Sequence, residues 1–307
     1  MFSISECRER PRQHIMAKEG TDFLCEKRLK KLNPDLYARY KDTPFALNKI
    51  LDRFKILFPE FTDHTLLHCV TVADFCNVLI GRQIDIMNED EIYVLLMASY
   101  LHDSGMAMRE KDVEDFKEQI PYGDYFETHP DASTSDFVRE FHHEFSGVFI
   151  RKYAGMLDIP SDEHVFSIVQ VSRGHRRTDL YDEKEYPAEF RVPSGNTVCL
   201  PYLSALIRLS DEIDVVASRN PLLLYDLDTL EDAKQIMEHL KHKVIRSLIT
   251  TDDSFTMCVY TEDAELIKQI EGVRDKMQRT LDYCRDVVEK RTKYRITQKH
   301  VVMRLME

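Results

Sequence analysis

The hydrophobic and polar positions of the chain follow a helical period over most of its first 220 residues. Apolar residues recur at the three- and four-residue spacing that places them on one helix face. This pattern predicts helices over residues 44–58, 64–80, 89–103, 136–154, 161–173 and 201–218. The acidic stretch 107–135, with Pro121 and Pro130, is expected to form an insertion or lid, and residues 174–199 are expected to be mostly loop.

The hydrophobic pattern changes towards the C-terminus. Val244–Ile249 and Phe255–Tyr260 are rich in β-branched and aromatic residues and are separated by a polar turn, so we expect a hairpin. A long helix over residues 262–290 and a third strand at His300–Leu305 should follow. The expected fold is therefore mainly α, a helical bundle with a small α+β C-terminal subdomain. It divides into an N-terminal helical arm (1–45), a helical domain (46–220) and the subdomain (221–307).

The composition narrows the class of protein. The net charge is −12 and the pI is near 5.5, which argues against membrane binding and general nucleic-acid binding, because both normally need a basic surface. The seven cysteines are dispersed and form no Cys-x-x-Cys motif, a pattern typical of free thiols in a reducing compartment. A signal-peptide pattern and a long apolar run are both lacking, so a cytoplasmic location is expected.

The most unusual polar residues follow the most apolar segment. Residues 92–101 are apolar almost throughout, and His102-Asp103 comes directly after them. Buried ionisable groups are costly unless they are paired or bound to a metal. His68, His175 and Asp211 also lie on apolar faces or at the ends of predicted helices. A single core histidine is more often satisfied by hydrogen bonds, but this combination of imidazole and carboxylate groups is typical of a metal site between helices.

These residues resemble the HD-domain superfamily of metal-dependent phosphohydrolases, whose skeleton is His…His-Asp…Asp on an all-helical fold. His68 begins a His-x-x-x-Val pattern, and His102-Asp103 corresponds to the pair that gives the superfamily its name. Asp211 lies in Arg-Leu-Ser-Asp-Glu-Ile-Asp, which looks like the last ligand motif. The resemblance covers residues 60–215 and implies an HD-type helical bundle in which His68, His102, Asp103 and Asp211 hold a metal ion.

Superfamily members with a binuclear site add two further histidines, and His175 fits the second of them. For the first, His142 and His143 compete. His142 shares its helix face with Phe145 and other apolar residues, so it is the expected ligand. The resemblance then implies one or two divalent ions (Mn, Fe, Ni, Co, Zn or Mg), with Asp103 shared and a metal-activated water as nucleophile. The segment Arg139-x-x-His142-x-x-x-Ser146 also resembles an HD subgroup of bacterial conflict-system proteins.

Three further residues are candidates for catalysis and substrate binding. The spacing His64-x-x-x-His68 looks like the His-x-x-x-His of cyclic-nucleotide phosphodiesterases, which implies that His64 is the general acid. A plain helix-terminal role for His64 remains open. Arg176 and Arg208 lie near the ligands in the sequence and could contact substrate phosphate. A salt bridge is the competing interpretation for Arg208.

The resulting hypothesis is a metal-dependent phosphohydrolase or phosphodiesterase that acts on a nucleotide or related phosphate ester. Its expected partner is a phosphorylated small molecule, and homo-oligomerisation is left open. A nuclease or a cyclic-oligonucleotide phosphodiesterase is the rival enzyme. The rival outside enzymes is a metal-stabilised, non-catalytic HD module that acts as a sensor or adaptor in a defence system.

Overall fold

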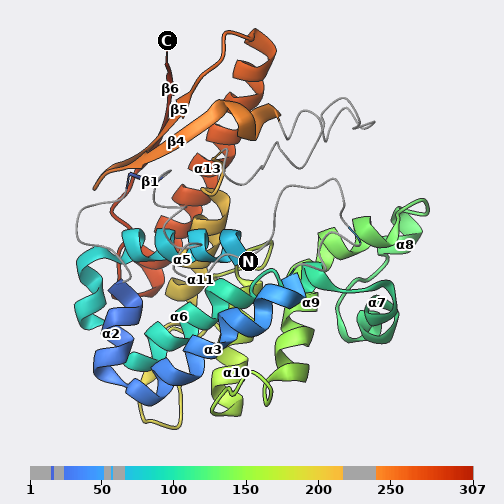
Figure 1. The fold of residues 1–307 in the computed structure, drawn as a ribbon, viewed down its shortest axis with the longest axis vertical. Coiled ribbons are helices and arrows are strands. Elements are labelled where there is room, and N and C mark those ends of the chain that lie inside the picture. Colours follow the sequence, from blue (N-terminus) through green and yellow to red (C-terminus); the bar gives the residue numbers. More distant parts are fainter. Residues whose placement is uncertain (1–14, 17–23, 52–56, 58–65, 217–239, 307) are drawn as a thin grey trace.

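The computed structural model describes residues 15–16, 24–51, 57, 66–216 and 240–306 of the chain. Most of these residues form a helical body, and a small sheet with one long helix lies at its end (Figure 1). The body is built from α2 (Leu24–Leu32), α3 (Pro34–Leu51), α5 (Leu66–Ile80), α6 (Glu89–Leu101), α9 (Thr134–Tyr153), α10 (Asp162–Arg173) and α11 (Leu200–Glu212). The expected mainly α fold is confirmed.

Helix α6 is the centre of the body. It packs against α2, α3, α5 and α10, and all of Ile92–Leu101 is buried. A capping box starts it: the Asn88 side chain accepts from the backbone N–H of Glu91, and the Glu91 carboxylate accepts from the backbone N–H of Asn88. A helix that is apolar on every side must be buried. His102 and Asp103, which follow this helix directly, therefore lie deep inside the protein.

Several helix boundaries differ from the sequence prediction. Helix α3 begins at Pro34 and continues through Pro44, where the sequence predicts a helix start. Tyr40 and Leu47, on either side of Pro44, are both buried, so packing outweighs the local cost of an interior proline. Helix α11 has Pro201 in its first turn, as expected, but ends at Glu212 and not at residue 218.

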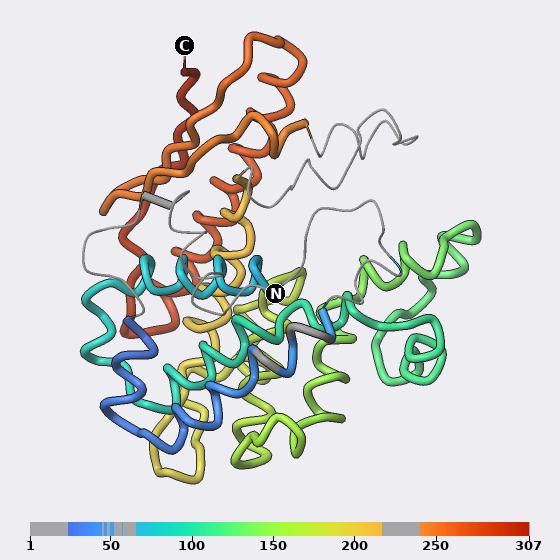
Figure 2. The backbone as a smooth tube through the Cα atoms, viewed as in Figure 1, coloured from blue at the N-terminus to red at the C-terminus, as the bar shows by residue number. Residues whose placement is uncertain are grey.

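The stretches expected to be irregular contain short elements. The acidic stretch 107–135 forms a protrusion with α7 (Glu110–Phe116) and α8 (Tyr125–Thr128), visible in both views of the chain (Figures 1 and 2). The short 3-10 helices are η1 (Gly81–Ile86), η2 (Ser104–Ala107) and η3 (Lys117–Gln119). A small antiparallel hairpin of β2 (Phe190–Arg191) and β3 (Thr197–Val198) lies in the predicted loop.

The C-terminal elements match the prediction closely. The strands β4 (Ile245–Thr250) and β5 (Ser254–Val259) form the expected antiparallel hairpin, and β6 (His300–Leu305) adds parallel to β5. A strand from the N-terminal part, β1 (Ile15–Met16), pairs parallel with β4, which gives the order β1-β4-β5-β6. Helix α13 (Ala264–Arg291) packs on both β6 and α11 and so joins the sheet to the helical body (Figure 1).

Two further expectations concern the whole chain. The six cysteines among the described residues are free and buried. Over the same residues, the structure contains no helix long and apolar enough to cross a membrane. The division at residues 45 and 220 stays a prediction; α3 runs across the first of these points.

Candidate metal centre

Six residues predicted as metal ligands come together in the interior of the helical body. They form two groups that share Asp103: His68, His102, Asp103 and Asp211 in the first, and Asp103, His142 and His175 in the second. Within each group, the candidate ligand atoms lie within 4.8 Å of one another. Helices α5, α9 and α11 and the residues just after α6 and α10 supply them. His64, which the sequence predicts as the general acid, lies outside the described residues.

Asp103 lies between the two groups and offers one carboxylate oxygen to each. Its Oδ2 is 3.4 Å from Nε2 of His68 and 3.5 Å from Nε2 of His102. Its Oδ1 is 3.5 Å from Nε2 of both His142 and His175. Ligands bound about 2.1 Å from one metal stand about 3.0–3.4 Å apart, so these separations are close to the edges of a coordination polyhedron. Asp103 is therefore in a position to bridge the two groups.

The backbone fixes the orientation of three of the imidazole rings. Each directs Nδ1 at the carbonyl oxygen three residues earlier in the chain: His102 at Ser99 (3.0 Å), His142 at Arg139 (2.7 Å) and His175 at Ser172 (2.5 Å). A carbonyl can only accept, so Nδ1 carries the proton in each ring. A neutral ring of this tautomer presents a lone pair at Nε2, which is the form that binds a metal.

The lone pairs converge on each other. Nε2 of His142 is 2.9 Å from Nε2 of His175, and Nε2 of His68 is 3.2 Å from Nε2 of His102. Nε2 of His68 is also 3.2 Å from Oδ1 of Asp211. Acceptors that face acceptors repel unless a cation or a proton lies between them. The donor set, neutral imidazole with carboxylate, fits divalent transition metal ions.

The titration of the second group argues for a metal ion over a shared proton. Burial lowers the pKa of His142 to about 3; the charge of Asp103 opposes this, and Arg176 adds to it. Burial also lowers the pKa of His175 well below its ordinary value, and the neighbouring His142 and His102 add to the effect. Both rings are thus neutral at pH 7. Two neutral rings whose Nε2 atoms lie this close could share a cation as ligands.

Burial and nearby positive charge act in opposite directions on the pKa of the Asp211 carboxyl. Burial by itself raises its pKa, whereas positive charge beside it lowers the pKa: with His68 as imidazolium, or with a cation in place of that proton, the carboxyl has a pKa well below its ordinary value. Asp211 is therefore ionised. The first group then combines imidazole nitrogen with anionic oxygen, which could hold one divalent ion.

The structure separates the two competing histidines of α9. His142 lies in the second group, as its helix face predicts. His143 instead has Nε2 3.6 Å from Oε1 of Glu144, and its buried Nδ1 has no hydrogen-bond partner among the described residues. Glu144 in turn forms a two-bond ion pair with Arg173 of α10, at 2.9 and 2.7 Å. This pair fixes α9, which carries His142, against α10, which ends two residues before His175.

A close approach of backbone to backbone holds η2 against α9. The Ser146 hydroxyl donates to the His102 carbonyl at 2.6 Å and accepts from the N–H of Gly105 at 2.8 Å. A Cβ on Gly105 would lie 2.1 Å from the carbonyl oxygen of His142, so only glycine fits there. This contact sets the distance between His102-Asp103 and His142, and with it the spacing of the two groups.

Sequence reasoning missed Asp214. Its Oδ2 accepts from Nδ1 of His68 at 2.7 Å, and both side chains are buried. A carboxylate behind a ligating histidine fixes the ring and raises its basicity. The signal in the sequence was a second aspartate three residues after Asp211. It becomes informative only when a hydrogen-bond partner is sought for Nδ1 of each candidate histidine.

The two predicted phosphate contacts differ in their surroundings. Arg208 donates from Nε to the Gly174 carbonyl and from Nη2 to the Thr178 carbonyl, both at 2.7 Å, and so ties the loop after His175 to α11. Arg176 has a buried Nε without a hydrogen-bond partner among the described residues, and its charge lowers the pKa of His142. Arg176 thus keeps an unused donor beside the cluster. Phosphate binding by either residue stays a prediction.

The fold and this cluster define the class of protein: a mainly helical HD-type domain with a His/Asp centre that could hold a metal ion. The family model HD-CE matches residues 58–294, and the chain therefore belongs to the HD-CE family. The match continues past residue 220 into the C-terminal elements. No curated protein and no solved structure gives a match to the chain.

Proposed function

We propose that the chain is a metal-dependent phosphohydrolase or phosphodiesterase that hydrolyses a nucleotide or related phosphate ester in the cytoplasm. The observation that carries this proposal is the bridging position of Asp103 between two groups of unprotonated ligand atoms. His68, His102, Asp103 and Asp211 would hold one divalent ion, and Asp103, His142 and His175 a second. Such ions, when bound, make water a nucleophile at neutral pH and neutralise phosphate charge.

The chain's own residues would orient the reaction. Asp214 keeps the proton on Nδ1 of His68, and three backbone carbonyls do the same for His102, His142 and His175. Arg176 would bind a phosphate oxygen through the Nε that otherwise has no acceptor. Because these groups are fixed by buried hydrogen bonds before substrate arrives, little reorganisation is needed during the reaction.

A cationic cavity lined by residues close in the sequence to the candidate ligands His175 and Asp211 supports an anionic substrate. Its volume is about 440 Å³, and four basic residues line it: Arg177, Arg208, Lys276 and Arg279. Lys276 forms an ion pair at 3.0 Å with Glu212, the residue after the candidate ligand Asp211. Four cations gathered here contrast with the net charge of −12 of the whole chain. Arg208 would then serve the substrate through this cavity as well as holding the loop.

The direct test is reconstitution followed by a substrate screen. Metal-free protein would be loaded separately with Mn, Fe, Co, Ni, Zn or Mg and given nucleotides, p-nitrophenyl phosphate and bis-p-nitrophenyl phosphate. We expect hydrolysis of at least one substrate by wild type, its loss in Asp103→Asn, and its retention in Asp115→Asn, which changes an exposed aspartate of α7. Equal activity in Asp103→Asn would contradict the proposal. Bound metal without hydrolysis of any substrate would favour the sensor or adaptor.

His64 is proposed as the proton donor to the leaving oxygen. Loss of a general acid typically costs about 10²–10⁴ in rate. His64→Ala should therefore keep its metal but hydrolyse poor leaving groups slowly, with a smaller defect for p-nitrophenolate, which needs no proton. Loss of metal, or an equal defect for both kinds of leaving group, would show that His64 has another role.

A further inference from the structure

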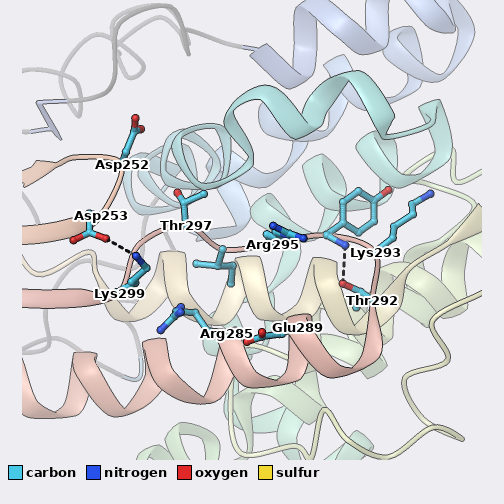
Figure 3. Close-up of a pocket in the computed structure, with 11 residues that line it drawn as sticks. Asp252, Asp253, Arg285, Glu289, Thr292, Lys293, Arg295, Thr297 and Lys299 are labelled. Carbon is cyan, nitrogen blue, oxygen red and sulfur yellow. Dashed lines mark hydrogen bonds and ion pairs between the residues drawn. The ribbon is translucent and has the colours of Figure 1, made fainter.

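A second cavity lies in the C-terminal part of the chain, and its lining residues are distinct from the candidate metal ligands. Its volume is about 740 Å³, within the range typical of small-molecule sites. It lies between α13, the turn that joins β4 to β5, and the segment 292–299 (Figure 3). We call it the C-terminal cavity.

The segment along one side of this cavity has a two-residue period. Tyr294, Ile296 and Gln298 are buried, whereas the residues between and beside them are exposed and line the cavity: Lys293, Arg295, Thr297 and Lys299. In an extended chain, alternate side chains point to opposite sides. Burial of one side therefore leaves three cations and a hydroxyl on the other, and Tyr294 and Ile296 also reach the lining of the cavity.

Buried contacts hold this segment to the helical body. The Tyr294 hydroxyl donates to Oε2 of Glu91 at 2.7 Å, and the Tyr294 ring stacks on Tyr202 with centroids 4.0 Å apart. The Gln83 side chain holds the backbone of Arg295 at both ends: Oε1 accepts from its N–H at 2.6 Å, and Nε2 donates to its carbonyl at 2.5 Å. The cations are thus carried by a backbone that is already ordered, which lowers the entropic cost of binding.

A fourth cation reaches the cavity from α13. The Nε of Arg285 is buried and has no hydrogen-bond partner among the described residues. Figure 3 shows Arg285 and Glu289 on α13, opposite the segment 292–299. A buried donor without an acceptor is costly, and a guanidinium pairs well with phosphate oxygens. This donor could therefore bind an acceptor of a ligand in the cavity.

The acidic residues of the cavity do not cancel its charge. Asp253 forms an ion pair with Lys299 at 3.1 Å, and Asp252 and Glu289 are the other two carboxylates. Four basic and three acidic side chains line the cavity, so it is net positive in a chain of net charge −12. The charge of this lining favours a small anion over a cation.

We propose that the C-terminal cavity binds a phosphate-bearing small molecule of about nucleotide size, with Arg285 and Arg295 as its phosphate contacts. The site is separate from the metal centre and does not depend on hydrolysis there. Its occupant would contact α13, the helix that also packs on α11, and α11 carries the candidate ligand Asp211.

Titration calorimetry on the full chain tests this proposal, with ATP and pyrophosphate as probes and adenosine as the uncharged control. EDTA in the buffer keeps metal-dependent phosphate binding at the other centre out of the signal. We expect saturable binding of ATP and pyrophosphate but not of adenosine. Arg295→Gln and Arg285→Gln should each weaken it at least about tenfold, whereas Lys268→Gln, at an exposed lysine of α13 outside the cavity, should not.

Arg295 has an exposed side chain, so its substitution tests the proposal even where Arg285→Gln fails to fold, which circular dichroism would reveal. No saturable binding of either probe by wild type would overturn the proposal. Binding that is equally tight in Arg295→Gln and Lys268→Gln would overturn it as well, because the probe would then lie elsewhere.

Discussion

The metal centre and the C-terminal cavity gather opposite kinds of polar atom. In the metal centre, imidazole lone pairs and carboxylate oxygens face one another, so acceptors meet acceptors. In the C-terminal cavity, guanidinium and ammonium groups gather, and the buried Nε of Arg285 lacks an acceptor. The first arrangement suits a cation, and the second suits an anion. The kind of atom left without a partner is thus the basis of both proposals.

The two regions also differ in burial. The ligands of the metal centre are buried between helices, except Asp211, which is partly exposed. Most of the cations of the C-terminal cavity lie on exposed positions of an extended segment. Substitutions in the metal centre should therefore change both function and stability, and those in the cavity should change binding alone.

Asp103→Asn should have the largest effect. The variant keeps the shape of the side chain but removes the charge shared by both groups. Metal-ion catalysis contributes several kcal/mol, so we expect hydrolysis to fall by about 10³-fold or more, together with metal content. Binding of ATP in EDTA at the C-terminal cavity should not change. Activity within about tenfold of wild type would contradict the bridging role.

Substitution of the two neighbouring histidines of α9 should give different results. His142→Ala removes a ligand of the second group and should lower metal content from about two ions per chain to about one. His143→Ala should leave the content unchanged, because His143 faces Glu144. Elemental mass spectrometry of the two purified variants measures this. The reverse pattern would show that the ligand assignment on α9 is wrong.

Asp214→Asn should have a moderate effect. The carboxylate does not belong to either ligand group but holds Nδ1 of His68. Partners of this kind typically contribute 10–100-fold in metal affinity or activity, so a loss of about that size is expected. Metal titration of the metal-free variant against wild type checks it. Unchanged affinity and activity would mean that His68 is oriented in another way.

The metal-free protein should lose stability in mild acid. The folded-state pKa of His142 is about 3, below the value of about 6.5 in an unfolded chain. Between these values the unfolded state binds more protons than the folded state. The free energy of unfolding therefore decreases as the pH is lowered. The expected slope is at most about 1.4 kcal/mol per pH unit from this residue.

Urea unfolding in EDTA, between about pH 7 and pH 5, measures this slope. His142→Ala removes the titrating group and should therefore show a smaller dependence on pH than wild type. Identical slopes in the two proteins would mean that His142 is not held neutral in the folded state.

Local signals made much of the fold predictable. Helix α5 ends at Ile80 because Gly81 follows with φ +50°, and the two strands of the hairpin are rich in β-branched and aromatic residues on either side of a polar turn. The continuation of α3 through Pro44 was not predictable, because it depends on burial of Leu47 and Leu51 against the rest of the body. Local propensity says nothing about such contacts.

In the candidate site, the ligands were predictable from the sequence and the contacts that position them were not. The six ligand positions could be chosen from residue type, helix face and resemblance, and the structure brings all six together. Asp214 could not, because its contact joins positions 146 residues apart in the sequence. The positioning contacts of Arg208 likewise depend on where the loop after His175 folds back on α11.

The most direct test of the central claim is a crystal structure of the protein loaded with manganese, with the anomalous signal used to locate the metal. We predict two anomalous peaks about 3.5–4 Å apart. One should lie among His68, His102 and Asp211 and the other between His142 and His175, with Asp103 contacting both. Manganese bound elsewhere while these side chains remain metal-free, in protein that hydrolyses its substrate, would contradict the account.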